Sequence, residues 1–234
     1  MGLAVGVDLG GTKIAAGLVT EDGRIRRDAR CETPEGPGAV VDAIVALISE
    51  LEAEPGTPVG IGAAGFIDSG RRTVLFAPNL EGWQDVALAD DVAARIGAPV
   101  VLENDANAAG WAEVRFGAAV GERSVVCVTV GTGIGGGIVL DGALQRGGFG
   151  IAGEFGHVAL VRDGLPCPCG QRGCWERYAS GSALEREARA LVAAGEAPAL
   201  AGACGGDPAA LTGAMVHAAG MAGDPAAVRL IGEI

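Results

Sequence analysis

The spacing of apolar residues in the first hundred positions changes several times between the period of a strand and that of a helix. Alternating or continuous apolar stretches predict strands at residues 3–9, 13–19, 24–31, 58–65 and 99–104. Apolar residues at helical spacing predict helices at residues 40–54 and 86–97. Because strands and helices alternate along the chain, we expect an α/β fold whose sheet contains parallel strands.

A strand-turn-strand unit occurs twice. Residues 5–23 run from an apolar strand through a glycine-rich turn into a second strand and then an acidic-glycine turn. The same order recurs from residue 124, where SVVCVTV leads through GTGIGGG into the strand IVL and then Asp141-Gly142. The repetition predicts two domains of one topology, a small one at residues 1–106 and a larger one at residues 107–234.

The last fifty residues have the pattern of helices. Helical spacing and capping residues predict helices at residues 181–195, 207–220 and 224–234. The third of these helices has no C-terminal stop signal. We therefore expect the chain to be incomplete at its C-terminal end.

Composition and charge argue against nucleic acid and membranes as binding partners. The 234 residues are 49% hydrophobic and carry a net charge of −12, so no basic surface is expected for binding nucleic acid. The N-terminal apolar stretch lacks basic residues before it and is interrupted by Asp8, which argues against a signal peptide. The uncharged run at residues 124–140 is rich in glycine and reads as two strands, so no membrane association is expected. These features predict a cytoplasmic protein whose six cysteines stay reduced.

The first glycine-rich turn, DLGGTK, can bind an anion. Gly10 and Gly11 allow the backbone to approach a phosphate closely, and Thr12 and Lys13 add a hydroxyl and an ammonium group. Asp8, at the end of the first strand, is placed to hold Mg²⁺. The alternative is an ordinary β-turn beside a buried aspartate.

The second turn, GTGIGG at residues 131–136, matches the G-x-G-x-x-G pattern of dinucleotide-binding proteins. That pattern requires a following helix, whereas the residues that follow here predict a strand. We therefore interpret Gly131, Thr132 and Gly133 as a hairpin that binds phosphate.

Two polar residues follow the strand at 99–104. In the stretch ENDAN, Asn104 and Asp105 lie where a strand gives way to a helix. Asp105 is either an N-cap of that helix or a catalytic base at the carboxyl end of a strand, where α/β sheets place their ligands.

A cluster of thiols predicts a metal site. His157 in GEFGH precedes three cysteines in CPCGQRGCWE, and His157, Cys167, Cys169 and Cys174 together make a Cys₃His set typical of structural zinc. A reactive thiol pair or a disulfide are the alternatives.

The motifs DLGGTK, ENDAN, VTVGTGIGGG, GEFGH and CPCGQRGCWE, in this order, resemble the ROK family (repressors, open reading frames, kinases), most closely its bacterial ATP-dependent glucokinases. The resemblance covers essentially the whole chain. It implies a duplicated actin-like, ribonuclease-H-like fold with two domains around a cleft, and a homodimer or homotetramer. Family members continue beyond the equivalent of Ile234, so the resemblance also implies a truncated C-terminal part.

The resemblance further implies that Asp105 is the general base that takes the proton from the 6-hydroxyl of glucose as it attacks the γ-phosphate of ATP. The two glycine-rich turns would then bind the phosphates, with Mg²⁺ near Asp8, and the product would be glucose 6-phosphate. The residues implied to bind the sugar are Gly65, Asn79, Asn104, Asp105, Glu154, His157 and Glu176.

Two alternatives remain at this point, and a third is disfavoured. The family also phosphorylates other hexoses, among them fructose, mannose and N-acetylhexosamines. A chain that lacks part of the nucleotide site could be a sugar-binding fragment without activity. A repressor is the disfavoured alternative, because ROK repressors carry a DNA-binding helix-turn-helix ahead of the first strand, and we expect the first strand here to begin at about Leu3.

Overall fold

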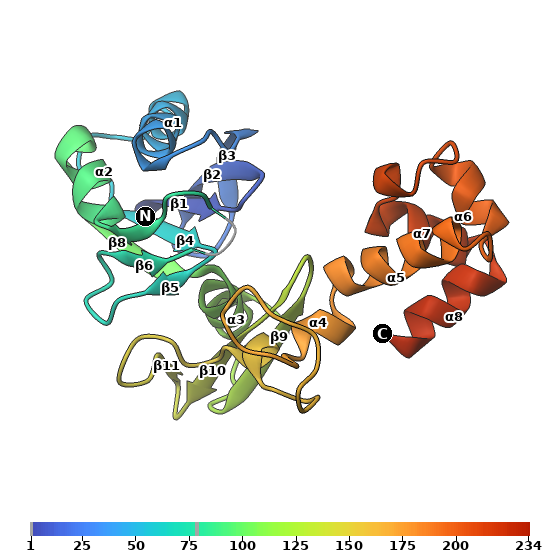
Figure 1. The fold of residues 1–234 in the computed structure, drawn as a ribbon. Helices are drawn as coiled ribbons and strands as arrows, with labels where there is room; N and C mark the ends of the chain where they lie inside the picture. Colours follow the sequence, from blue (N-terminus) through green and yellow to red (C-terminus); the bar gives the residue numbers. More distant parts are fainter. Residues whose placement is uncertain (1, 78–79) are drawn as a thin grey trace. The chain divides into compact units, whose positions relative to one another are not determined.

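A computed structural model describes residues 2–77 and 80–234 (Figure 1). The chain forms two compact units, which we describe separately. Unit 1 comprises Met1–Val128 and Gly136–Gly153, and unit 2 comprises Thr129–Gly135 and Glu154–Ile234. The predicted division at residues 106 and 107 falls inside unit 1, and that domain assignment stays a prediction.

A five-stranded sheet in the order β3-β2-β1-β4-β8 is the centre of unit 1. β1 pairs antiparallel with β2 and parallel with β4, which in turn pairs parallel with β8. The mixed sheet confirms the expected α/β class with parallel members. Its strands are β1 (Leu3–Leu9), β2 (Lys13–Thr20), β3 (Ile25–Glu32), β4 (Val59–Ala63) and β8 (Val100–Asn104).

The two faces of this sheet differ. Helices α1 (Pro37–Glu50) and α2 (Leu88–Ile96) lie on one face, where their apolar side chains form one core with those of the strands (Figure 1). Alternate residues of β1 point into that core, so Val7 is buried and Asp8 is exposed on the opposite face. The strand alternation therefore directs Asp8 away from the core.

Two further sheets belong to the chain's first two thirds. The first, in the order β5-β6-β7, consists of β5 (Phe66–Ile67), β6 (Val74–Phe76) and β7 (Gln84–Val86), which are too short to give a periodic signal in the sequence. The second has the order β11-β10-β9 and consists of β9 (Val125–Val130), β10 (Ile134–Leu140) and β11 (Ala143–Gln145).

β10 begins four residues before the expected strand IVL, because its glycines belong to the strand and not to the turn. Helix α3 (Asp105–Phe116) passes so close that a Cβ on Gly137 would lie 3.2 Å from the carbonyl oxygen of Ala106. A glycine inside a strand commonly marks such an approach of another backbone. The glycine-rich sequence here therefore serves helix packing as well as the turn.

Unit 2 ends in a helical cluster with its own core. The elements of the unit after the second turn are η1 (Phe155–His157), α4 (Glu176–Ala179), α5 (Gly181–Ala193), α6 (Pro198–Ala203), η2 (Pro208–Ala210), α7 (Gly213–Met221) and α8 (Pro225–Glu233). Leu200, Leu211, Val216 and Leu230 are buried in this core.

The predicted helix at 207–220 is wrong in its first part. Leu211 is extended, and the Thr212 side chain accepts a hydrogen bond from the Met215 amide, so a new helix starts there. Across the two described ranges, no helix has both the length and the apolar character that a bilayer crossing requires.

Candidate functional site

The first glycine-rich turn joins β1 to β2 and is held by bonds to its carbonyl groups. The Gly10 amide donates to the Lys13 carbonyl at 3.1 Å. The Thr33 hydroxyl donates to the Gly10 carbonyl at 2.7 Å, and the Thr33 amide donates to the Thr12 carbonyl at 3.0 Å. Thr33, the residue that follows β3, therefore fixes the turn from its carbonyl side.

Asn104, and not Asp105, caps helix α3. The Asn104 Oδ1 atom accepts a hydrogen bond from the Asn107 amide at 2.9 Å, which satisfies one free donor of the first turn. Its Nδ2 atom donates to the Gly65 carbonyl at 3.2 Å, so the structure brings these two predicted sugar-binding residues together. The interpretation of Asp105 as the N-cap is therefore wrong, and the Asp105 Oδ1 atom instead accepts a hydrogen bond from the next amide in the chain, that of Ala106, at 2.9 Å.

Asp105 is the first residue of α3 and borders a cavity within unit 1. The cavity has a volume of about 800 Å³ and is also lined by Asp8, Glu103, Arg71 and Arg146. The Asp105 side chain reaches solvent, yet the surrounding protein desolvates it enough to raise its pKa, and the charge of Asp8 raises that pKa further. A carboxylate with a raised pKa is a better proton acceptor than an ordinary one.

One predicted sugar-binding residue, Asn79, lies outside the described residues. The other predicted residues divide between the two units. Asp8, Gly65, Asn104 and Asp105 belong to unit 1 with the first turn, whereas Glu154, His157 and Glu176 belong to unit 2 with the second turn.

The second glycine-rich turn is fixed by the start of helix α5. The Gly181 amide donates to the Gly131 carbonyl at 2.8 Å. Ser182 donates to the Thr132 carbonyl twice, from its hydroxyl at 2.8 Å and from its amide at 3.2 Å. Strand β10, and no helix, follows the turn, so the dinucleotide-binding interpretation is excluded by the requirement for a helix.

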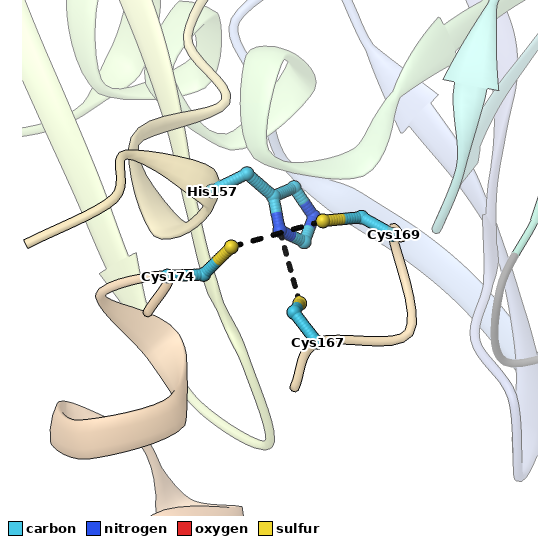
Figure 2. A group of neighbouring side chains, drawn as sticks. All are labelled: His157, Cys167, Cys169 and Cys174. Carbon is cyan, nitrogen blue, oxygen red and sulfur yellow. Dashed lines mark hydrogen bonds between the residues drawn. The ribbon is translucent and has the colours of Figure 1, made fainter. Parts of the chain in front are cut away.

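The four predicted metal ligands lie together in unit 2. The ligand atoms of His157, Cys167, Cys169 and Cys174 are all within 4.8 Å of one another. Figure 2 shows the imidazole ring among the three thiols, with the Nδ1 atom of His157 on the side of Cys167.

The spacing of these donor atoms matches a tetrahedral zinc site. Zn–S bonds of about 2.3 Å and Zn–N bonds of about 2.05 Å at tetrahedral angles separate two sulfurs by about 3.8 Å and a sulfur from a nitrogen by about 3.6 Å. The Cys169 and Cys174 sulfurs are 3.7 Å apart, and the Cys167 sulfur is 3.6 Å from His157 Nδ1. The residues therefore fit Zn²⁺ in both donor type and distance.

Burial also shapes the chemistry of this cluster. It raises the pKa of the Cys167 thiol to about 12 and raises that of Cys174 as well. Thiols of this kind are poor nucleophiles, because the thiolate is the reactive form. A reactive thiol pair is thus a weaker interpretation than a metal site, where the cation itself favours the thiolates.

Glu176 connects the metal cluster to the second turn. Its Oε1 atom lies 3.7 Å from His157 Nδ1 and accepts a hydrogen bond from the Cys167 thiol at 3.5 Å. Its other oxygen would lie only 2.9 Å from a Cβ placed on Gly133. Unit 2 therefore brings a predicted sugar ligand, the metal ligands and a predicted phosphate-binding turn into one cluster.

Several residues that shape these sites have no role in the sequence predictions. Glu103, Arg71 and Arg146 form an ion-pair cluster beside Asp105, and Ser182 holds the second turn. The charged residue Glu103 near the end of the apolar strand PVVLEN was the one available signal. The contact of Ser182 with Thr132 joins residues fifty positions apart, which no local pattern reveals.

Comparisons with known proteins identify close relatives. The model of the ROK family matches residues 4–234. A glucokinase of Streptomyces coelicolor is 49% identical over 231 residues, covering 97% of this chain and 73% of the relative. An N-acetylmannosamine kinase of Yersinia pseudotuberculosis is 40% identical over 190 residues, which are 80% of this chain and 64% of that protein.

A solved structure gives the same picture. The crystal structure of a ROK family glucokinase from Streptomyces griseus, in complex with glucose and AMPPNP, superposes with a TM-score of 0.89 at 50% sequence identity. The match covers 98% of this chain and 74% of that structure.

Proposed function

This chain belongs to the ROK family, and from that membership we propose that it is an ATP-dependent glucokinase, which transfers the γ-phosphoryl group of ATP to the 6-hydroxyl of glucose. The observation that carries the proposal is the similarity to glucokinases along nearly the whole chain, including one solved with glucose and an ATP analogue. The actin-like α/β fold expected from the motifs is confirmed by the same superposition.

In this proposal Asp105 is the general base. Phosphoryl transfer depends mainly on alignment and charge stabilisation, so a carboxylate that orients the hydroxyl and accepts its proton is sufficient. The raised pKa of Asp105 supports this role, because it brings the affinity for a proton closer to what a base near neutral pH requires. The geometry supports it too, since Asn104 caps the helix, while Asp105 borders the cavity and its Oδ1 atom is held by the Ala106 amide at 2.9 Å.

The two glycine-rich turns bind the phosphates in this proposal. The contributing residues are Gly10, Gly11, Thr12 and Lys13 in unit 1, and Gly131, Thr132 and Gly133 in unit 2. In both turns carbonyl groups already accept bonds from neighbouring elements, and the amides of Gly10 and Gly131 donate within their own turns, so we assign anion binding to the other amides and to the side chains. Asp8 offers an exposed carboxylate, the ligand type that Mg²⁺ prefers, and the ion when bound neutralises phosphate charge.

We assign the sugar hydroxyls to Gly65, Asn79, Asn104, Asp105, Glu154, His157 and Glu176. Carboxylates, an amide and an imidazole supply both donors and acceptors, and paired groups of this kind discriminate between hexose stereoisomers. The zinc ligand His157 and its neighbour Glu176 are held by the metal cluster, so zinc would act on sugar affinity through their orientation.

The remaining features of the proposal concern the whole protein. We propose a cytoplasmic homodimer or homotetramer. The six cysteines are all free thiols, which suits a reducing compartment. Light scattering coupled to size-exclusion chromatography would determine the oligomeric state.

The proposal is tested by incubating the purified chain with glucose, ATP and Mg²⁺ and coupling the product to glucose-6-phosphate dehydrogenase. NADPH formation that requires both ATP and glucose is the expected result. Parallel assays of ADP release with fructose, mannose and N-acetylmannosamine test the other hexoses, and a higher kcat/KM for one of these would replace glucose as substrate. If calorimetry shows glucose binding while ADP release stays at background, the chain is a sugar-binding fragment.

A further inference from the structure

Glu103 directly precedes the residues that cap and begin helix α3. We propose that Glu103, clamped by Arg71 and Arg146, is a positioning residue that sets the orientation of the base Asp105. The inference rests on the proposed function, and it gives a role to a carboxylate that the proposed chemistry does not use.

The Glu103 carboxylate is almost buried and is surrounded by cations. Its side chain is 12% exposed, and its Oε2 atom accepts bonds from Arg146 Nε at 2.7 Å and Arg146 Nη2 at 2.6 Å. Arg71 Nε lies 3.6 Å from the same oxygen and donates to the Leu102 carbonyl at 3.0 Å. Both Arg146 nitrogens bind this one oxygen, so their charge-assisted bonds fix the position of Oε2.

The other oxygen of Glu103 binds on both sides of the base. Oε1 accepts from the Asn104 amide at 3.2 Å and from Asn107 Nδ2 at 3.3 Å. Asn107 is itself 1% exposed. Because Asp105 lies between these two partners in the chain, Glu103 fixes the backbone before the base and the side chain one half-turn after it.

Folding alone does not explain this cluster. Glu103 is nearly buried, whereas the Arg71 and Arg146 side chains are 36% and 32% exposed. Ion pairs add little net stability, whether they are exposed or buried, so this cluster is a poor means of strengthening the strand. A charge network instead provides defined directions. Here the hydrogen bonds of Glu103 go to residues at the start of α3. A displacement of the base by about 1 Å can lower the reaction rate about a hundredfold.

The clamp also reaches the segment that leads toward Glu154. The Arg146 carbonyl accepts a bond from the Ala152 amide at 3.0 Å, which closes the loop between them. Within unit 1 this loop packs tightly, because a Cβ on Gly150 would lie 2.3 Å from the Ile67 carbonyl. Through Arg146, Glu103 therefore connects the start of α3 with the tightly packed loop between Arg146 and Ala152.

Two variants and a matched control separate positioning from stability. Glu103→Gln presents an amide to Arg146 and breaks the clamp. The double variant Glu103→Met with Arg146→Met removes both charges at similar volume, so its thermal midpoint should return to that of the wild type. Arg72→Met is the control, since Arg72 is the neighbour of Arg71 but pairs with Asp90 on the surface.

We expect kcat to fall about 10- to 100-fold in both Glu103 variants, with the KM for glucose and for ATP changed less than threefold. Hydrogen exchange at the amides of Ala106 and Asn107 should become faster in both, and Arg72→Met should match the wild type. Recovery of kcat together with the thermal midpoint in the double variant would overturn the proposal, because a purely structural role predicts that result.

The exchange measurement keeps this test separate from the proposed function. If the wild type does not phosphorylate glucose, the proposed function fails. Faster exchange at the α3 terminus in the variants would then still support the positioning role, and unchanged exchange would refute it.

Discussion

The ionised form of Asp105 is the form that can accept a proton, but its surroundings make ionisation unfavourable. The surrounding protein desolvates its carboxylate and so raises its pKa, and the nearby charge of Asp8 adds to the effect. A carboxyl group whose pKa is higher in the folded than in the unfolded state favours folding most at low pH, and this contribution is lost as the pH rises through the folded pKa. At neutral pH the ionised Asp105 therefore lowers stability while it supplies the base.

The first prediction follows from this conflict. Asp105→Asn should lower kcat by about 10²- to 10⁴-fold, the usual contribution of a general base. Its thermal midpoint at pH 7 should be at least as high as that of the wild type, because the unfavourable charge is gone. Steady-state kinetics and differential scanning calorimetry test the two parts, with Asp91→Asn on the exposed side of α2 as the control.

The same residue predicts a pH dependence. The wild-type kcat/KM should decline on acidification as Asp105 takes up a proton, with a midpoint above the ordinary range of aspartate. A profile whose acid limb follows an unperturbed aspartate would contradict the assignment. Equal activity of Asp105→Asn and wild type would contradict it more directly.

Gly133 offers a second prediction at this scale. A Cβ at this position would lie 2.9 Å from Glu176 Oε2, so Gly133→Ala should displace a proposed sugar ligand. Overpacking of this kind costs about 1–3 kcal/mol, and the glucose KM should rise at least about fivefold. Gly131→Ala is the comparison, because no atom lies within 4 Å of the added carbon and the glucose KM should stay within twofold. Equal glucose constants in the two variants would disprove the contact.

Residue roles could be predicted only where a motif carried them. Asn104, Asp105 and the four metal ligands stand out in the sequence because their chemistry is unusual for their surroundings. Which of Asn104 and Asp105 caps the helix was not predictable, since either side chain can act as an N-cap and the choice depends on backbone direction. Glu103 needs partners from two distant segments, and local spacing contains no information on them.

At the scale of elements, the start of α5 does more than end a loop. The amides of Gly181 and Ser182 and the Ser182 hydroxyl donate to carbonyl groups of the second turn, so the helix and the turn form one rigid piece. Free amides at a helix start usually bind side chains, water or ligands. Here the carbonyl groups of the turn satisfy them, and within the turn the Gly131 amide donates to the Gly133 carbonyl at 3.0 Å.

Ser182→Ala tests this piece. The variant removes a hydroxyl bond of 2.8 Å, and a hydrogen bond of this type contributes about 1 kcal/mol, or roughly a fivefold change in affinity. We expect the KM for ATP to rise by about that factor while the glucose KM changes less than twofold. Ser49→Ala on α1 is the matched control, because its hydroxyl bonds only to the Val45 carbonyl of its own helix among the interactions described. Unchanged ATP affinity would show that the turn keeps its shape without the hydroxyl.

The elements themselves were predictable to very different degrees. Long strands such as β1 and β2 were found because one face is buried and the alternation is regular. The strands of the β5-β6-β7 sheet have two or three residues, too few for any period to appear. In the helical cluster, small apolar residues on all sides concealed where one helix ends and the next begins.

At the scale of the whole molecule, the two units have separate cores. The core of unit 1 contains the five-stranded sheet with α1 and α2, and that of unit 2 contains α5 to α8. The metal cluster lies wholly within unit 2. Metal binding should therefore stabilise one unit and leave the other unchanged, since cooperative unfolding follows contiguous packing.

Removal of zinc tests this expectation. A strong chelator, or Cys169→Ala, should lower the midpoint of one calorimetric transition and not of the other; in a small domain, 1 kcal/mol of lost stability lowers the midpoint by roughly 4–8 °C. Trp175 lies beside Cys174 and is the one tryptophan of unit 2, so its fluorescence in a Trp83→Phe, Trp111→Phe background reports which unit responds.

Cys169→Ala should also raise the glucose KM severalfold. A metal assay without zinc in the fresh protein, or a normal glucose KM in the zinc-free variant, would refute the link.

The path of the chain between the units has a practical meaning for protein engineering. The chain leaves unit 1 after Val128, returns at Gly136 and leaves again after Gly153. The second turn is therefore contributed to unit 2 by the tip of a hairpin whose strands are rooted in unit 1. A fragment starting at residue 154 would contain the zinc ligands and every helix of unit 2 but expose the donors of Gly181 and Ser182. To express that unit separately, one would have to graft residues 129–135 onto it.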